Sequence, residues 1–322
     1  MMHIILANPR GYCAGVERAI LIVHRAIEAF GKPVYVRHEI VHNRYVVDSL
    51  RGNGAVFVDE LDEVPAGALV IFSAHGVSPA VVNEAQARGL RMLDATCPLV
   101  TKVHLEVNQH ARAGRSVIFI GHDGHPEIEG TRGHFDRTRG GEIHLVANES
   151  DAETVTVPNP NRVAYATQTT LSVSDTARIV AILKRRFPRM VAPKKDDICY
   201  ATQNRQTAAR LLAERCDVLL VIGAPHSSNS TRLRELGSQC GVPAYLIQDA
   251  SELKHEWLLG VDTVGLTSGA SVPEVLVQGV IARVQTWWPG TVVESFGEPE
   301  HTVFRLPHEL RPGVVAKAAK PA

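Results

Sequence analysis

The chain has few aromatic side chains and no excess of charge of either sign. Phe, Trp and Tyr account for 5% of its 322 residues, and 34 Lys and Arg residues are balanced by 34 Asp and Glu residues. A balanced charge argues against nucleic acid or an anionic membrane as a partner, because both are bound by surfaces rich in Lys and Arg. We therefore expect neither partner, and an anionic small molecule would have to be held by local hydrogen-bond donors.

Long apolar runs, an export signal and nucleotide-binding motifs are also missing. The apolar run within residues 1–9 is too short for a signal peptide and has no basic region before it, so we expect a cytoplasmic protein. No stretch approaches the length of a membrane span. The sequence contains neither a P-loop nor the Gly-x-Gly-x-x-Gly fingerprint of dinucleotide-binding folds.

Cysteine is scarce, and its distribution argues against a disulfide framework. The five cysteines are an odd number and are widely scattered in a chain without an export signal. Free thiols, a metal ion or a metal cluster are the better interpretations. Cys216 lies between a helical pattern and a strand, and Cys240 precedes Gly241 at an expected helix end, so we interpret both as structural.

A threefold pattern begins at the other three cysteines, Cys13, Cys97 and Cys199. Each precedes a helical periodicity and then a β-branched run, at residues 34–36, 116–120 and 218–222. Polar residues follow these runs at a nearly constant distance, because His42, His125 and Ser227 come 28 or 29 residues after their cysteines. A second strand and a third strand follow in each unit, and the third strand ends in another polar turn, at residues 73–78, 166–172 and 267–273.

This pattern predicts an α/β fold built from three pseudo-equivalent domains with mainly parallel sheets. We place them at residues 1–97 (with the N-terminal strand), 98–198 and 199–285, followed by a C-terminal segment, 286–322, that is mobile from about Gly313. Polar loops beyond the carboxyl ends of parallel strands are where ligands bind. If the domains pack around a pseudo-threefold axis, the cysteines and polar loops converge on one centre. Ordinary βα alternation with polar loops is the alternative.

Three thiolates at one point could bind an iron–sulfur cluster with one iron left without a protein ligand. Such an open position is typical of a catalytic metal site. The iron could act as a Lewis acid on a substrate oxygen, and the cluster could supply electrons. The spacing is weak evidence by itself, since scattered cysteines are often small buried hydrophobic residues.

Two loops contain candidate chemistry. In residues 121–131, Glu127 stands beside histidines and could deliver a proton, with its approach fixed by Pro126, whereas Glu129 is interpreted as a structural or surface residue. Residues 223–231 precede a helix, and their Ser, Asn and Thr side chains could cap it or bind phosphate. Ser271, His42 and His75 could donate to the same phosphate. The alternatives are a solvated loop, a helix cap and ordinary core or surface histidines.

His38-Glu39-Ile40-Val41-His42 matches the His-Glu-x-x-His motif of zinc peptidases. That motif requires a helix, whereas this one directly follows the strand-like residues 34–36. Zinc-dependent hydrolysis through His38, Glu39 and His42 is therefore a second hypothesis, and a non-catalytic diphosphate-binding module is a third.

Eight stretches in the same order resemble the family of 4-hydroxy-3-methylbut-2-enyl diphosphate reductases, which act last in the non-mevalonate isoprenoid pathway. The resemblance extends from about His3 to Leu310. His226 departs from the family pattern, in which another polar residue is usual. The stretches are residues 7–16, 36–44, 72–78, 94–100, 124–127, 167–172, 197–202 and 227–230.

The resemblance implies a trefoil of three α/β domains around a central [4Fe-4S] cluster. It implies reductive dehydroxylation of (E)-4-hydroxy-3-methylbut-2-enyl diphosphate to isopentenyl diphosphate and dimethylallyl diphosphate. The substrate hydroxyl would bind the open iron, and a ferredoxin or flavodoxin would donate electrons. Its implied residues are Cys13, Cys97 and Cys199 as cluster ligands; Glu127, Thr169 and His125 as catalytic residues; and His42, His75, His125, Thr169, Ser227, Ser228, Asn229 and Ser271 as substrate-binding residues.

Overall fold

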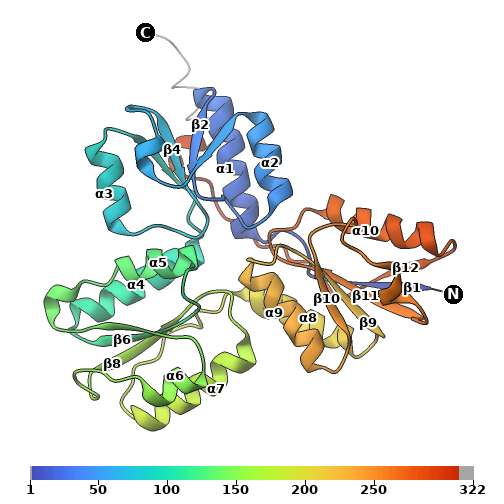
Figure 1. The fold of residues 1–322 in the computed structure, drawn as a ribbon. Helices are drawn as coiled ribbons and strands as arrows, with labels where there is room; N and C mark the ends of the chain where they lie inside the picture. Colours follow the sequence, from blue (N-terminus) through green and yellow to red (C-terminus); the bar gives the residue numbers. More distant parts are fainter. Residues whose placement is uncertain (1, 312–322) are drawn as a thin grey trace. The chain divides into compact units, whose positions relative to one another are not determined.

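The structure, a computed structural model, describes residues 2–311. The segment expected to be mobile from about Gly313 lies outside these residues. The described chain folds into three parallel sheets with helices on their faces, which confirms the predicted α/β class (Figure 1). No helix in this part of the chain combines the length and apolar character needed to cross a membrane.

The first sheet has the strand order β3-β2-β4-β5. Figure 1 shows α1 and α2 on one side of it and α3 on the other. Its third strand, β4, is completely buried and delivers the polar turn that contains His75. The elements are α1 (Ala14–Phe30), β2 (Val34–Arg37), α2 (Arg44–Asn53), β3 (Ala55–Val58), the 3-10 helix η1 (Leu61–Glu63), β4 (Leu69–Phe72), α3 (Pro79–Ala87) and β5 (Arg91–Asp94).

The second sheet has the order β7-β6-β8 and is covered on both faces. One core cluster packs α4 and α5 against it, around Val103, Val107 and Ile128. The other packs α6 and α7, around Ile179 and Leu183. The elements are α4 (Pro98–Arg112), β6 (Ser116–Ile120), α5 (Pro126–Gly133), η2 (Arg137–Arg139), β7 (Ile143–Val146), α6 (Glu149–Thr154), β8 (Val163–Thr167) and α7 (Val173–Arg186).

The third sheet has the order β10-β9-β11-β1-β12. One core cluster fills the space between the sheet and α10, and another fills the space between its opposite face and α8 with α9. The elements are β1 (His3–Ala7), α8 (Tyr200–Ala213), β9 (Val218–Ile222), α9 (Ser228–Gln239), β10 (Ala244–Ile247), η3 (His255–Leu258), β11 (Thr263–Ser268), α10 (Glu274–Trp287) and β12 (Val292–Phe296), and η4 (His308–Leu310) follows.

Each sheet contains three consecutive strands of the chain in the same arrangement. The first strand lies in the middle, flanked by the second and the third, as β3-β2-β4, β7-β6-β8 and β10-β9-β11. Central strands such as β6 and β9 are buried along their whole length, which is why they read as continuous apolar runs. The three-unit pattern of the sequence is thus present in the topology.

Strand β1 pairs in parallel with β11 on one side and with β12 on the other. The N-terminal strand, which the sequence grouped with the first domain, therefore belongs to the third sheet, and the segment after residue 285 completes that sheet. Long-range strand pairing of this kind leaves no local sequence signal. The domain boundaries drawn from the sequence, and the trefoil arrangement around a centre, stay predictions.

The chain divides into two compact units. Unit 1 comprises residues 1–14, 42–46 and 200–303 and holds the five-stranded sheet. Unit 2 comprises residues 15–41, 47–199 and the described residues from Phe304 onward, and it holds the other two sheets. The predicted functional residues are divided between the two units.

Candidate functional site

The backbone amides of the three predicted ligand cysteines make equivalent hydrogen bonds. Each amide donates to a carbonyl in the polar turn that follows a third strand, and the next helix begins one residue after the cysteine. Each cysteine stands at the start of one repeat and is hydrogen-bonded to the last turn of the preceding repeat. For Cys13, in the first repeat, the partner turn is that of the third repeat. The bonds run from Cys13 to Ala270 (3.1 Å), from Cys97 to Ala74 (3.0 Å) and from Cys199 to Thr169 (3.0 Å).

The chemistry of these three sulfurs fits an iron–sulfur cluster. Cys13, Cys97 and Cys199 are half-buried thiols without disulfide bonds, each at the N-terminal end of a helix. A helix N-terminus favours the negative charge of a ligand sulfur. Neither of the remaining cysteines directly precedes a helix, although Cys216 is half-buried like the other three. Burial raises the pKa of Cys216 to about 11, and Cys240 is an exposed residue at the end of α9.

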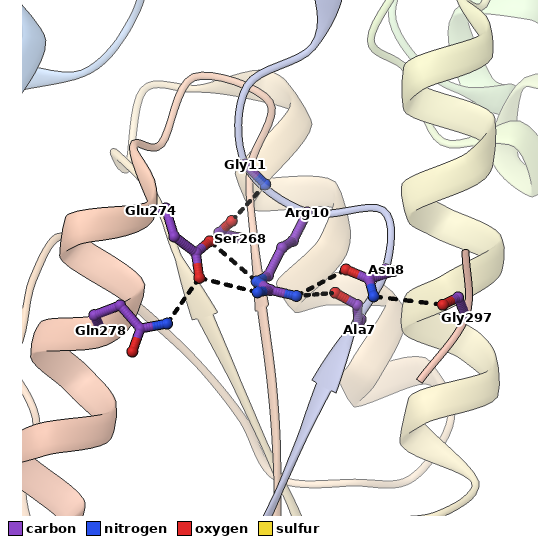
Figure 2. A network of polar contacts seen from close by, with 8 residues as sticks. All are labelled: Ala7, Asn8, Arg10, Gly11, Ser268, Glu274, Gln278 and Gly297. Carbon is purple, nitrogen blue, oxygen red and sulfur yellow. Dashed lines mark hydrogen bonds and ion pairs between the residues drawn. The ribbon is translucent and has the colours of Figure 1, made fainter. Parts of the chain in front are cut away.

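The loop that carries Cys13 is fixed by a polar network within unit 1 (Figure 2). The guanidinium of Arg10 makes two parallel hydrogen bonds to the carboxylate of Glu274, at 3.1 and 2.9 Å. The Gly11 amide donates to Ser268 Oγ at 2.9 Å, and Gly11 has a φ of +71°, where a side chain would be strained. The backbone two residues before Cys13 is therefore held in one conformation.

A completely buried arginine holds the other side of this loop. Arg205 on α8 is 0% exposed and donates to the carbonyls of Gly11 (2.8 Å) and Ala201 (3.0 Å) and to the Glu300 carboxylate (2.9 Å). It joins the approach to Cys13 to the first turn of the helix that follows Cys199. Sequence reasoning missed Arg205, although its place on the apolar face of α8, four residues after Ala201, was a usable signal.

Glu127 is the carboxylic acid among the predicted catalytic residues, and its pKa is strongly raised. It is 2% exposed; its Oε1 accepts the Thr169 amide (2.6 Å) and its Oε2 accepts the Thr169 hydroxyl (3.0 Å). Burial raises the pKa of Glu127 to about 7, against the lowering effect of these two hydrogen bonds. Glu129, two residues further on, is exposed, which agrees with the surface alternative for this residue. A carboxyl group with this pKa can hold and release a proton at neutral pH.

Two predicted substrate-binding histidines lie together in unit 2. The rings of His75 and His125 meet edge to face, with their centroids 5.5 Å apart. His75 follows β4 of one sheet and His125 follows β6 of another, so turns from both sheets contribute to this group. His125 also caps α5, because its Nδ1 accepts the Glu127 amide at 3.1 Å. The stretch that the sequence presented as one loop therefore includes a helix start that orients Glu127.

The other predicted substrate-binding residues gather in unit 1, around the N-terminus of α9. Ser227 is the N-cap of this helix but makes no side-chain capping bond to it. Asn229 is buried; its Oδ1 accepts the Ala270 amide, and its Nδ2 has no hydrogen-bond partner within residues 2–311. Ser271 donates its hydroxyl to the backbone oxygen of His42 at 3.0 Å. A buried amide donor without a partner beside a helix N-terminus suits an anionic ligand.

The residues of the zinc-peptidase motif do not form the helix that this motif uses. Residues 38–42 lie between β2 and α2 and are not helical, and His38 has a φ of +60°. The two histidines therefore do not lie on one face of a helix. His42 is instead beside His226, with ring centroids 4.9 Å apart and nearly perpendicular planes. His226, noted in the sequence only as a departure, is thus part of the unit 1 group.

Comparisons with known proteins agree with this architecture. A family model described as LytB protein matches residues 4–285. The 4-hydroxy-3-methylbut-2-enyl diphosphate reductase of Ectopseudomonas mendocina is 59% identical over 310 residues, which cover 96% of this chain and 99% of that protein. The protein of the same name from Acinetobacter baylyi is 57% identical, with coverage of 96% and 98%.

Solved structures give the same result. The E-1-hydroxy-2-methyl-but-2-enyl-4-diphosphate reductase from Plasmodium falciparum matches with a TM-score of 0.91 and 37% identity, over 96% of both chains. A structure of (E)-4-hydroxy-3-methyl-but-2-enyl diphosphate reductase matches with a TM-score of 0.63 and 32% identity, over 89% of this chain and 100% of that one. Because the family model spans most of the sequence and relatives match it along nearly their whole length, the chain belongs to the LytB family of 4-hydroxy-3-methylbut-2-enyl diphosphate reductases.

Proposed function

We propose that the chain catalyses the reductive dehydroxylation of (E)-4-hydroxy-3-methylbut-2-enyl diphosphate. The C–O bond of the allylic alcohol breaks, two electrons and two protons are consumed, and water leaves with isopentenyl or dimethylallyl diphosphate as the other product. The observation that carries this proposal is the equivalent setting of Cys13, Cys97 and Cys199, each bonded to a polar turn and followed by a helix. The names of the relatives support the same substrate.

Cys13, Cys97 and Cys199 would hold a [4Fe-4S] cluster. When bound, the cluster supplies electrons and a Lewis-acidic iron that has no protein ligand. Cys216 is a poor fourth ligand, because its sulfur is buried against Gly265 and the pKa of its thiol is raised to about 11. Electrons would come from a ferredoxin or flavodoxin, as the resemblance to the reductase family implies. We place the reaction in the cytoplasm.

The diphosphate would be bound by donors that carry no permanent positive charge. His75 and His125 in unit 2 supply imidazole donors. In unit 1, the amides at the start of α9 and the buried Nδ2 of Asn229 can donate to phosphate oxygens. The complete set in this proposal is His42, His75, His125, Ser227, Ser228, Asn229 and Ser271.

Glu127 would provide the proton, and Thr169 would orient it. At pH 7 a carboxyl group with a pKa of about 7 is about half protonated, so proton release does not require a large change in pH. The Thr169 amide and hydroxyl donate to Oε1 and Oε2 of Glu127, so the two bonds hold the carboxyl group in one orientation. Because Glu127 is buried, the proton is protected from exchange with bulk water.

The test is metal analysis with cysteine variants. Oxygen-free wild-type protein should contain iron and acid-labile sulfide and should reduce the substrate with reduced methyl viologen. Cys13→Ser, Cys97→Ser and Cys199→Ser should each lose iron and turnover, whereas the matched control Cys216→Ser should keep both. Zinc without iron would favour hydrolysis. Phosphate binding without iron would favour a non-catalytic module, and either result would reject the proposal.

A further inference from the structure

A basic segment leads along the second sheet to Cys199. Residues 184–195 contain six Lys or Arg residues and no Asp or Glu, in a chain whose overall charge is balanced. Arg185 pairs with Glu153, and Arg186 donates to backbone carbonyls. The other four cations, Lys184, Arg189, Lys194 and Lys195, are exposed and have no ion-pair partner within residues 2–311.

This segment follows β8 along the edge of the sheet. Val191 forms a parallel bridge with Ala164, Asp197 accepts the Thr167 amide, and the Cys199 amide donates to the Thr169 carbonyl. Lys194 and Lys195, the last cations of the segment, therefore lie near the carboxyl end of β8, where the predicted catalytic residues are. Cys199 comes four positions after Lys195, so their Cα atoms are at most about 14 Å apart in any conformation.

Helix α4, which begins directly after Cys97, is attached to the same segment. Lys102 Nζ donates to the backbone oxygens of Lys195 (2.5 Å) and Asp196 (3.1 Å) and to the buried Asp197 carboxylate (2.7 Å). One turn further along α4, Leu105 is 67% exposed. Residues three apart on a helix share a face, so this apolar side chain stands beside Lys102. Cys97 and Cys199 are therefore both near one surface, in which the apolar Leu105 lies beside basic residues. The exposed basic residues are Lys194 and Lys195.

The acids near this surface reduce its positive charge only in part. Asp196 is exposed, while Asp197 is paired with Lys102. Glu106 also pairs with Lys102, at 3.5 Å, and its pKa is raised to about 7, mainly by burial and by its hydrogen bond with Asp197. Lys194 and Lys195 remain as two exposed cations side by side.

We propose that Lys102, Leu105, Lys194 and Lys195, which we name the α4 edge patch, form the docking site of a small acidic electron-transfer protein. This inference rests on the proposed function, which needs two electrons per substrate and a donor outside the chain. Each encounter transfers one electron from the reduced donor, so two encounters serve one turnover. A basic rim steers an acidic partner, and an interface of about 800 Å² on each partner is large enough to cover the patch.

The test compares a protein donor with a small one. The variant Lys194→Glu/Lys195→Glu reverses two exposed charges without touching the Lys102–Asp197 pair. With reduced flavodoxin as donor, kcat/KM at low salt should fall at least about 10-fold, and its dependence on salt should flatten. Turnover with reduced methyl viologen and iron content should both stay within twofold of wild type. Leu105→Ala should lower the flavodoxin rate alone, by about threefold.

The matched control is Arg137→Glu/Arg139→Glu, which reverses two exposed cations in η2 of the same unit and should leave both donors unaffected. Unchanged flavodoxin kinetics in the Lys194→Glu/Lys195→Glu variant would overturn the docking site. An equal loss with flavodoxin and methyl viologen would also overturn it, since the residues would then act on the site itself. Wild-type protein that fails to turn over with methyl viologen would reject the proposed function rather than the patch.

Discussion

Replacing Glu127 by Gln should stabilise the protein at alkaline pH and have little effect on stability at acidic pH. Glu127 is buried, and its pKa rises from the usual 4.5 to about 7 on folding, chiefly because burial disfavours the ionised form. Below pH 4.5 the carboxyl group is neutral in both the folded and the unfolded protein. As pH rises towards 7 the unfolded chain releases this proton first, so folding stability is lost until the folded pKa is passed.

The magnitude follows from the difference between the two pKa values. Each pKa unit corresponds to about 1.4 kcal/mol, so ionised Glu127 weakens folding by about 3 kcal/mol above pH 7. Gln removes the titration and keeps the shape. Its Oε1 can accept the Thr169 amide, and its Nε2 can donate to the Thr169 hydroxyl. The gain in free energy of unfolding should therefore grow by about 2–3 kcal/mol between pH 5 and pH 8.

The assay is denaturant unfolding at pH 5, 6, 7 and 8, with all proteins free of metal and under reducing conditions. The matched control is Glu129→Gln, which removes an exposed carboxylate two residues away and should show no such growth with pH. A stability difference between Glu127→Gln and wild type that is the same at every pH would refute the reasoning. Equal pH dependence in both variants would refute it as well.

Three further predictions concern Glu127 and the buried Arg205, which holds the Cys13 loop. Glu127→Gln should keep substrate affinity within about threefold but lower single-turnover rates at least about 100-fold, and near-normal rates would move the proton donor elsewhere. Wild-type turnover with reduced methyl viologen should decline as pH rises through about 7, because Glu127 then loses its proton, and a flat profile would contradict this. Arg205→Met leaves Glu300 and the Gly11 carbonyl without their cation and should lower the free energy of unfolding by about 3–5 kcal/mol, whereas the exposed Arg210→Met on the same helix should change it by less than about 0.5 kcal/mol.

Much of the architecture could be predicted because its signals are local. Buried central strands such as β6 and β9 are covered on both faces, so they appear in the sequence as continuous apolar runs between helical patterns. The repeat of these runs after three cysteines predicted three α/β units. The preference for Glu127 over Glu129 as the proton donor also came from local sequence, since Pro126 precedes Glu127 at the start of α5, and this role stays a prediction.

Other features depend on residues that are far apart in the chain. The pairing of β1 with β11 and β12 joins the two ends of the sequence, and no periodicity records it. The pKa of Glu127 depends on how deeply tertiary packing buries it, because desolvation is a property of the surroundings and not of the residue type.

The sequence by itself determined which thiols, imidazoles and carboxyl groups are candidates for the chemistry, because residue type and order along the chain are enough to identify them. Only the tertiary structure decided how they are held. The Cys199 amide is hydrogen-bonded to the Thr169 carbonyl. The buried Arg205 donates to Gly11 and Glu300, and Lys102 donates to Asp197 in the segment before Cys199. Hydrogen bonds depend on distance and direction in space, and these are fixed only when distant segments pack together.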